Sequence, residues 1–364
     1  MHLLGIDAIL IVMNIDDGRV IADKTMGEES MSEEAKVTIK LDDRVRLLSA
    51  VLAATDFPAK AQKMKPHGTH AHARATRKYL KEHDHHTAVV ATQALLDQNT
   101  GLEPFFALAM LMKWPEMTIA AMPPWAPPTY NQMLKDFYET AKLADWWKQE
   151  DDDWDKCKDE AEGIFNEAEF KTFLKPFLDD VTEDFTFMPN ISYPTDYNVG
   201  FRIGNELVCI APPPLAWGDS PPWPYDEPTM VTYTLRAAIS TYGRVLLDNY
   251  FKTHADGVTE AMKNALPVGD QFKAQYPTWK DQFFALFLSA VVAMYLEKHV
   301  DEGEYKAYML MQKKARGMAM LPGTVSVMRR YLQEVGKGGK YSNLIEFLPF
   351  FPRQLRVAKK IVTF

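Results

Sequence analysis

The sequence predicts an α+β fold that is mostly helical and contains a small antiparallel sheet. Long stretches repeat apolar residues every three to four positions, which is the main signal of amphipathic helices. Strand-like runs are few and short, at residues 37–41, 185–188, 199–203 and 207–210. With 364 residues, 47% hydrophobic and 25% charged, the chain can bury a substantial core in one large domain or two modest ones.

The amino-terminal segment begins with a predicted β-hairpin at residues 8–22, where an Asp-Gly turn separates two apolar runs. Residues 37–41 alternate as a half-buried strand, and helical spacing starts at Asp42. We therefore expect three parts: a hairpin extension (1–35), a helical amino-terminal part (36–182), and a core with carboxyl-terminal helices (183–364).

The helical part is predicted to be broken by proline. Residues 69–147 have helical spacing, with an interruption at the proline-rich stretch 122–128. Helices resume over 130–147 and 155–178, where Pro176 marks a late break.

The strands return after residue 182. Residues 199–203 and 207–210 form a predicted hairpin around the Gly204-Asn205 turn. The proline-rich stretch 211–225 cannot form regular structure, and we expect it to lie across the surface or over a cleft. Four helices are predicted beyond it, at residues 230–251, 278–299, 303–316 and 322–334.

Charge and cysteine content limit the possible functions. The net charge of −8 argues against nucleic acid as the main partner, because phosphate binding needs concentrated Lys and Arg. Only Cys157 and Cys209 occur, which favours a reducing compartment, and we expect a cytoplasmic protein. The longest apolar run, around 283–296, is too short for a membrane span and suits a buried helix.

The usual catalytic motifs are absent from the sequence. It contains neither His-Glu-x-x-His nor Gly-x-Ser-x-Gly, and it has no dinucleotide-binding fingerprint. Cys209 lies inside a predicted strand and is expected to be a core residue.

The densest group of histidines lies between residues 67 and 86 and comprises His67, His70, His72, His83, His85 and His86. Imidazoles can bind zinc, copper or nickel, but no carboxylate or cysteine completes an obvious ligand set here. We expect surface or helix-capping histidines, with a His-rich metal site as the alternative.

Three tryptophans lie in or beside proline-rich loops: Trp125, Trp217 and Trp223. Such residues form recognition surfaces or packed loop anchors, and we expect anchors.

Several segments, in this order, are similar to one family. They are 37–49, where Arg46 stands at a position that tends to be Glu in the family; 79–89, with Thr87 in place of proline; 234 and the residues after it; 276–293; and the aromatic end, 341–349. Together they resemble a domain-of-unknown-function family of predicted gluzincin-type metallopeptidases. The resemblance covers roughly residues 36–352 and implies a helical amino-terminal half followed by a zincin-like core.

The resemblance also implies that the zinc site has been lost. In the family the helix matching 231–250 carries His-Glu-x-x-His, in which two histidines hold zinc and the Glu activates water. On this alignment the ligand histidines are replaced by Arg236 and Ser240, and the base by Ala237. The third ligand, a Glu in the family, is Ala285, and a family Arg is Ser289.

We therefore expect a non-catalytic, metallopeptidase-like protein that keeps a cleft for a polypeptide or another ligand. Arg236, Ser240 and Ser289 are the candidate cleft-binding residues, and Ala237 and Ala285 are vestigial site positions. No metal, other cofactor, nucleic-acid partner or membrane span is expected. The alternatives are a hydrolase that acts through another site, such as the His-rich segment, and a structural or interaction scaffold.

Overall fold

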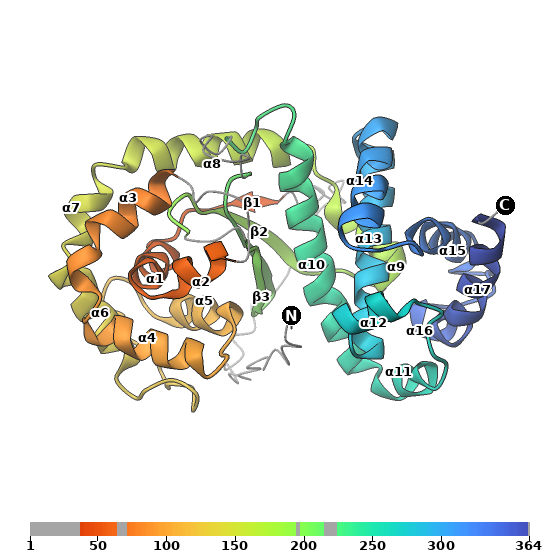
Figure 1. The fold of residues 1–364 in the computed structure, drawn as a ribbon, viewed down its shortest axis with the longest axis horizontal. Coiled ribbons are helices and arrows are strands. Elements are labelled where there is room, and N and C mark those ends of the chain that lie inside the picture. Colours follow the sequence, from red (N-terminus) through yellow and green to blue (C-terminus); the bar gives the residue numbers. More distant parts are fainter. Residues whose placement is uncertain (1–36, 64–70, 194–196, 215–223, 363–364) are drawn as a thin grey trace, which may run out of the picture.

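A mixed four-stranded sheet lies in the middle of the molecule, with helices on both of its faces (Figure 1). The computed structural model describes residues 37–63, 71–193, 197–214 and 224–362. The hairpin predicted at residues 8–22 lies outside these ranges.

The sheet consists of β1 (Thr38–Ile39), β2 (Asp184–Pro189), β3 (Val199–Ile203) and β4 (Glu206–Ala211), in the spatial order β1-β2-β4-β3. β1, β2 and β4 are parallel to one another, and only β3 is antiparallel to its neighbour. The prediction of an antiparallel sheet is therefore wrong. The β3–β4 hairpin is visible in the sequence because Gly204 supplies the turn with a φ of 55°. Parallel pairs join strands that are distant in the chain, as Thr38 and Thr186 are, and leave no local turn signal.

One face of the sheet is covered by the amino-terminal helices. Met188, Val208 and Ile210 point to this side and belong to the same core as Leu48 of α1 and Phe106 of α5. The helices of this region are α1 (Asp43–Ala54), α2 (Phe57–Lys63), α3 (Ala71–Tyr79), α4 (Thr87–Asp97), α5 (Leu102–Leu111), α6 (Tyr130–Thr140) and α7 (Leu143–Trp147), with the short 3-10 helix η1 (Lys81–His83).

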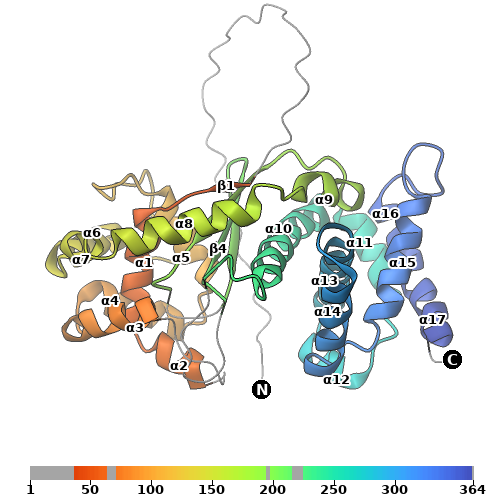
Figure 2. The ribbon, with the colours of Figure 1, turned by 90° about the horizontal axis from the view of Figure 1, so that it is seen from above.

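The opposite face carries a second core. Phe185, Phe187 and Cys209 point into it, together with Ile239 of α10 and Leu286 of α13. The helices on this side are α8 (Asp151–Phe165), α9 (Phe170–Leu178), α10 (Val231–Thr253), α11 (Ala255–Met262), α12 (Asp270–Gln275), α13 (Trp279–His299), α14 (Glu302–Ala315), α15 (Leu321–Glu334), α16 (Leu344–Phe347) and α17 (Phe351–Val362), with the 3-10 helix η2 (Leu348–Phe350). Seen from above, α8 extends from the amino-terminal helices toward the sheet (Figure 2).

Side-chain caps set the start of several helices. The Asp42 carboxylate accepts a hydrogen bond from the Arg44 amide at 2.9 Å, so α1 begins where the strand pattern ends. Thr278 and Asp281 form a reciprocal capping box at the start of α13. The helix predicted over 130–147 is instead two helices, because Lys142 adopts a left-handed conformation with a φ of 50°.

Two glycines let α10 approach its neighbours closely. A Cβ atom added to Gly200 of β3 would lie 2.1 Å from Cγ2 of Thr241 on α10. A Cβ atom added to Gly243 of α10 would lie 3.0 Å from Cδ2 of Leu288 on α13. The edge strand, α10 and α13 therefore form a tightly packed series.

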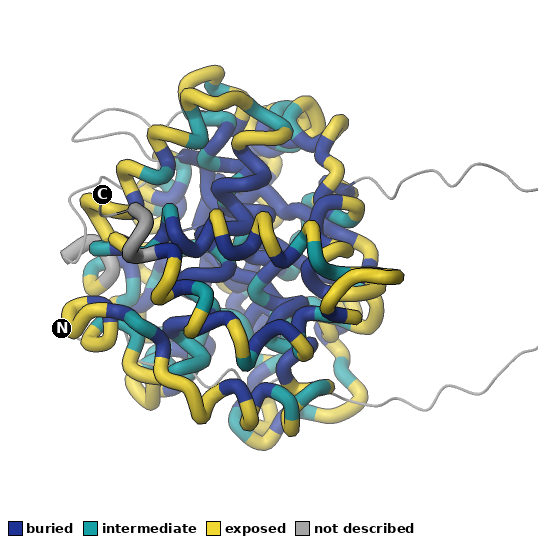
Figure 3. Tube along the Cα trace, turned by 90° about the vertical axis from the view of Figure 1, so that its right-hand side faces the viewer, coloured by how far each residue is buried: buried dark blue, intermediate teal, exposed yellow. Residues whose placement is uncertain are grey.

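α13 is a core helix. Among the described helices it alone has the length and composition of a membrane span, yet 67% of its most apolar 18-residue window is buried in the protein, and core helices of soluble proteins also pass this test. Figure 3 shows buried residues gathered inside an outer layer of exposed ones.

Candidate functional site

The candidate positions lie on α10 and α13, two helices that pack against each other. Arg236, Ser240 and Gly243 are spaced by four and three residues, so they lie along one face of α10. Gly243 contacts Leu288 of α13, next to Ser289. Ala285 lies one helical turn before Ser289 and is partly buried against the same core.

Ala237 has a different orientation. It is only 5% exposed and precedes Thr241, the residue that abuts Gly200, by four positions. Ala237, which the resemblance aligns with a catalytic base, is therefore on the sheet-facing side of α10 and has only a methyl side chain.

Arg236 is a half-buried cation held against aromatic rings. Its guanidinium carbon lies 5.6 Å from the ring centroid of Tyr308 and 5.8 Å from that of Tyr233. Burial lowers the pKa of Arg236, and the nearby Tyr308 and Tyr233 oppose that change. Among the ion pairs of the described residues, none joins Arg236 to a carboxylate within 4.0 Å.

Ser289 links this region to α14. Ser289 is 6% exposed. Its hydroxyl donates a hydrogen bond to Sδ of Met318 at 3.3 Å. It also lies close enough to the Tyr308 phenol to affect its ionisation: burial raises the pKa of Tyr308, and Ser289 partly offsets the rise. Tyr308 thus connects two candidate residues, Arg236 and Ser289.

The positions that the resemblance aligns with zinc ligands carry no usual zinc-binding side chain. The Ser240 hydroxyl donates to the Ala237 carbonyl oxygen at 3.2 Å, within its own helix. Ala237 and Ala285 have only methyl side chains. Within residues 37–362, apart from the undescribed gaps, no group of three or more His, Cys, Asp or Glu side chains could hold a metal ion.

An ion pair crosses the outer edge of β3. Glu103 belongs to α5 and Arg244 to α10, two helices on opposite faces of the sheet, and their side chains meet at 3.1 Å. Arg244 also donates a hydrogen bond to the Gly200 carbonyl oxygen at 3.3 Å. We call the Arg244–Glu103 pair the edge clasp. It occupies a backbone acceptor that an added strand would use.

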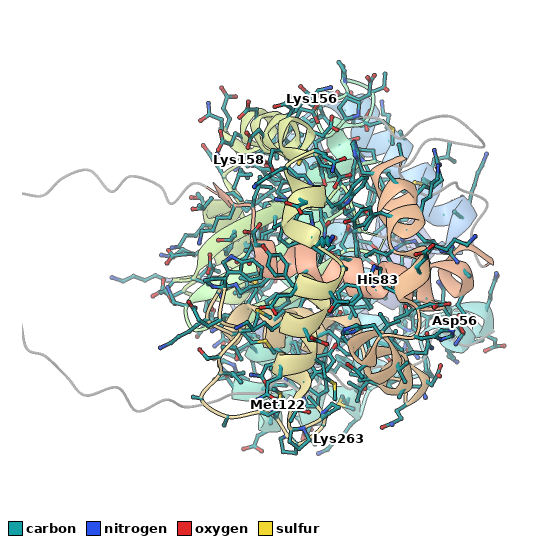
Figure 4. All side chains as sticks on the ribbon, turned by 90° about the vertical axis from the view of Figure 1, so that its left-hand side faces the viewer. Asp56, His83, Met122, Lys156, Lys158 and Lys263 are labelled. Atoms are coloured by element: carbon teal, nitrogen blue, oxygen red, sulfur yellow. The ribbon has the colours of Figure 1, made fainter. Side chains whose placement is uncertain are left out.

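The histidines do not form one site in the described structure. His86 caps α4 by accepting a hydrogen bond from the Ala88 amide at 3.2 Å, and it also contacts Asp136 at 3.0 Å. His83 lies in the middle of the face shown in Figure 4, edge-on to Phe137 with 6.1 Å between ring centroids. The prediction of a capping role is confirmed for His86, and that of a surface position for His85, which is exposed. His67 and His70 lie outside the described residues.

Arg46 forms a buried charge centre that the sequence analysis missed. It is 7% exposed, and its guanidinium carbon lies 4.5 Å from the ring centroids of both Trp147 and Trp154. Asp43 at 3.5 Å and Asp151 at 3.8 Å are its ion-pair partners. Burial lowers the pKa of Arg46, against the pull of these carboxylates. The group joins α1 to α7 and α8.

Glu150 continues this network toward α3. It is 5% exposed and lies 3.5 Å from Nδ1 of His72, whose Nε2 is 3.6 Å from Asp153. The hydrogen bond to Glu150 raises the pKa of His72. His72 is therefore a partner in an ionic network, separate from His83 and His86.

Cysteines and tryptophans act as packing residues where they are described. Cys209 is fully buried, as predicted, and burial raises its pKa to about 12, so the nucleophilic thiolate is disfavoured. Cys157 is also free and buried. Trp125 packs edge-on against Phe105 with 5.5 Å between centroids, which fits a loop anchor. Trp217 and Trp223 lie outside the described residues.

Comparison with known proteins finds no matching family model, no matching curated protein and no matching solved structure.

Proposed function

We propose that this chain is a non-catalytic, metallopeptidase-like protein that binds a ligand at the junction of α10 and α13. The observation that carries the proposal is the set of side chains at Arg236, Ala237, Ser240 and Ala285. None is a usual zinc ligand or a general base, and one is a cation.

The arrangement of the sheet and its helices supports a zincin-like core. The resemblance implies a cleft walled by an edge strand and two helices. Here β3 is an antiparallel edge strand on an otherwise parallel sheet, and the long helix α10 follows β4. α10 packs closely on β3 at Gly200, and α13 packs on α10 at Gly243.

The chemistry of the site favours binding over catalysis. A zinc peptidase needs three protein ligands and a metal-bound water of lowered pKa. Arg236 puts a fixed positive charge where the resemblance places a ligand, which repels a divalent cation and attracts an anion. The edge clasp reduces access to β3, so side-chain contacts at α10 and α13 are the better candidates for ligand binding than strand addition. The low cysteine count keeps the cytoplasm as the proposed location.

Zinc content and peptide hydrolysis test the proposal directly. Protein purified without chelators should contain far less than one zinc per chain, measured by inductively coupled plasma mass spectrometry. It should also leave a mixed peptide library uncut. Stoichiometric zinc together with cleavage that a chelator abolishes would overturn the proposal.

A gain-of-metal variant tests the alignment itself. Arg236→His, Ala237→Glu and Ser240→His together rebuild the first helix, and Ala285→Glu adds the third ligand. If Ala285 faces the same site as Arg236 and Ser240, the fourfold variant should bind zinc at least about tenfold more tightly than the threefold variant that keeps Ala285. Equal affinities would remove Ala285 from the site and overturn the frame of comparison.

A further inference from the structure

Arg236 is a partly buried cation that forms no ion pair with a carboxylate in the part of the chain that the structure describes. Removing a guanidinium from water costs free energy, and proteins usually offset this with carboxylates. The contacts of Arg236 are instead the rings of Tyr233 and Tyr308. Glu304 contributes an attractive charge but forms no ion pair within 4.0 Å among the described residues.

A second arginine lies near the same tyrosines. Arg316 follows α14 and is exposed, and its charge opposes the rise that burial causes in the pKa of Tyr308 and of Tyr276. Arg316 has no carboxylate within 4.0 Å among the described ion pairs either. Arg316 is two residues before Met318, whose sulfur accepts the hydrogen bond of Ser289 at 3.3 Å, so the chain around Arg316 lies beside the region of Ser289 and Tyr308.

The surroundings combine positive charge with aromatic surface. Tyr233 and Tyr276 are partly exposed, while Tyr308 is 6% exposed. Planar guanidinium groups form paired hydrogen bonds with carboxylates, and tyrosine rings contact apolar groups. A ligand that joins a carboxylate to an apolar or aromatic group matches both features.

We propose that Arg236 and Arg316 bind a carboxylate next to an aromatic or apolar group, as found at the carboxyl terminus of a peptide. Arg236 forms the ion pair, Arg316 adds a second positive charge, and the tyrosines contact the apolar group. This inference rests on the proposed ligand-binding function and names its ligand class.

A pair of probes that differ only in charge tests the inference. N-acetyl-phenylalanine and N-acetyl-phenylalaninamide are titrated into the full-length protein and followed by ligand-observed NMR. The acid should bind at least about tenfold more tightly than the amide, because a hydrogen bond to a charged group is worth about that ratio. Equal affinity for acid and amide would overturn the inference.

Variants assign the preference to particular side chains. Arg236→Gln should abolish the preference for the acid, and Arg316→Gln should reduce it. Arg329→Gln is the matched control, because Arg329 also lies over a tyrosine, Tyr305 at 5.8 Å, but has a carboxylate partner in Glu297. It should leave the preference unchanged. A preference that survives Arg236→Gln would overturn the inference.

One further variant and one further pair of ligands complete the test. Arg236→Lys retains the charge but not the planar pair of donors, and it should show an intermediate preference even if Arg236→Gln fails to fold. Peptides that end in Phe, with a free or amidated terminus, distinguish a polypeptide from a small carboxylate. Tighter binding of the free peptide than of N-acetyl-phenylalanine indicates a polypeptide, and weaker binding a small carboxylate; both support the site.

The two tests fail independently. Zinc-dependent cleavage would overturn the proposed function while the acid–amide comparison still reports on Arg236. A zinc-free, inactive protein that shows no acid preference would overturn only the carboxylate site.

Discussion

Replacing Gly200 with alanine should destabilise the protein, because β3 and α10 leave no space for a side chain there. The new Cβ atom would lie 2.1 Å from Thr241 Cγ2, whereas ordinary contacts begin at 3.4 Å. Such overpacking costs about 1–3 kcal/mol. Alanine also restricts the unfolded chain, which returns about 0.5–1 kcal/mol. Together these ranges give a net fall of about 0–2.5 kcal/mol in the free energy of unfolding, and we expect a value near the middle, about 1 kcal/mol.

Urea denaturation followed by circular dichroism measures this loss, and two variants isolate its cause. Gly163→Ala, on an exposed turn of α8 where nothing lies within 4 Å of the added Cβ, should stabilise the protein by about 0.5–1 kcal/mol. Thr241→Ser removes Cγ2 but keeps the hydroxyl, which partly offsets the rise that burial causes in the pKa of Cys209. It should therefore recover most of the loss when combined with Gly200→Ala.

Either of two results would contradict close packing of β3 on α10. Gly200→Ala could prove as stable as the unmodified protein, which would mean that β3 and α10 are not in close contact. Alternatively, the effects of Gly200→Ala and Thr241→Ser could add to within about 0.5 kcal/mol, which would mean that their side chains do not compete for space.

Three further predictions concern ionisation, reactivity and capping. Glu150 raises the pKa of His72 in the folded protein. The contribution of His72 to stability is therefore present below the ordinary histidine pKa and is lost as pH rises through the folded pKa. His72→Gln should flatten that part of the curve of unfolding free energy against pH, measured by urea denaturation. Cys209 and Cys157 should not react with a thiol reagent until the protein unfolds, and rapid labelling of the native protein would contradict their burial. Thr278→Ala should lower the unfolding free energy by about 1 kcal/mol through loss of the α13 cap, and an unchanged urea midpoint would refute this.

The sequence predicts local structure well where the signal is local. The long helix expected at residues 230–251 is α10, Val231–Thr253, and that expected at 278–299 is α13, Trp279–His299. α10 repeats apolar residues at helical spacing, α13 is a long apolar run that is buried on most of its sides, and the β3–β4 hairpin has a clear turn at Gly204. The parallel strand pairs are invisible to the same reasoning, because no short-range pattern specifies which distant strands pair.

The charge centre around Arg46 shows why dense local charge can mislead. The acidic run at residues 150–155 has the composition of a solvated linker or helix start, and α8 does begin there, at Asp151. Glu150 itself is buried, because the turn before α8 directs it toward a cluster that includes Arg46 of a distant helix. Only the folded chain brings these charges together.

The sequence likewise predicts only part of the candidate site. The resemblance named Arg236 and Ser289, and both lie near Tyr308 in the structure. Tyr308 and Arg316 belong to α14 and its carboxyl-terminal end, which no motif pointed to. Helix packing, rather than sequence spacing, brings them to Arg236.

The edge clasp also bears on how copies of this protein behave in concentrated solution. An open strand edge lets identical molecules join strand to strand into aggregates, and proteins commonly block such edges with charged side chains. Arg244 and Glu103 cover β3 in this way and tie the two faces of the sheet together. Removing the Arg244–Glu103 pair should therefore cause self-association at high protein concentration before it causes a large fall in the free energy of unfolding.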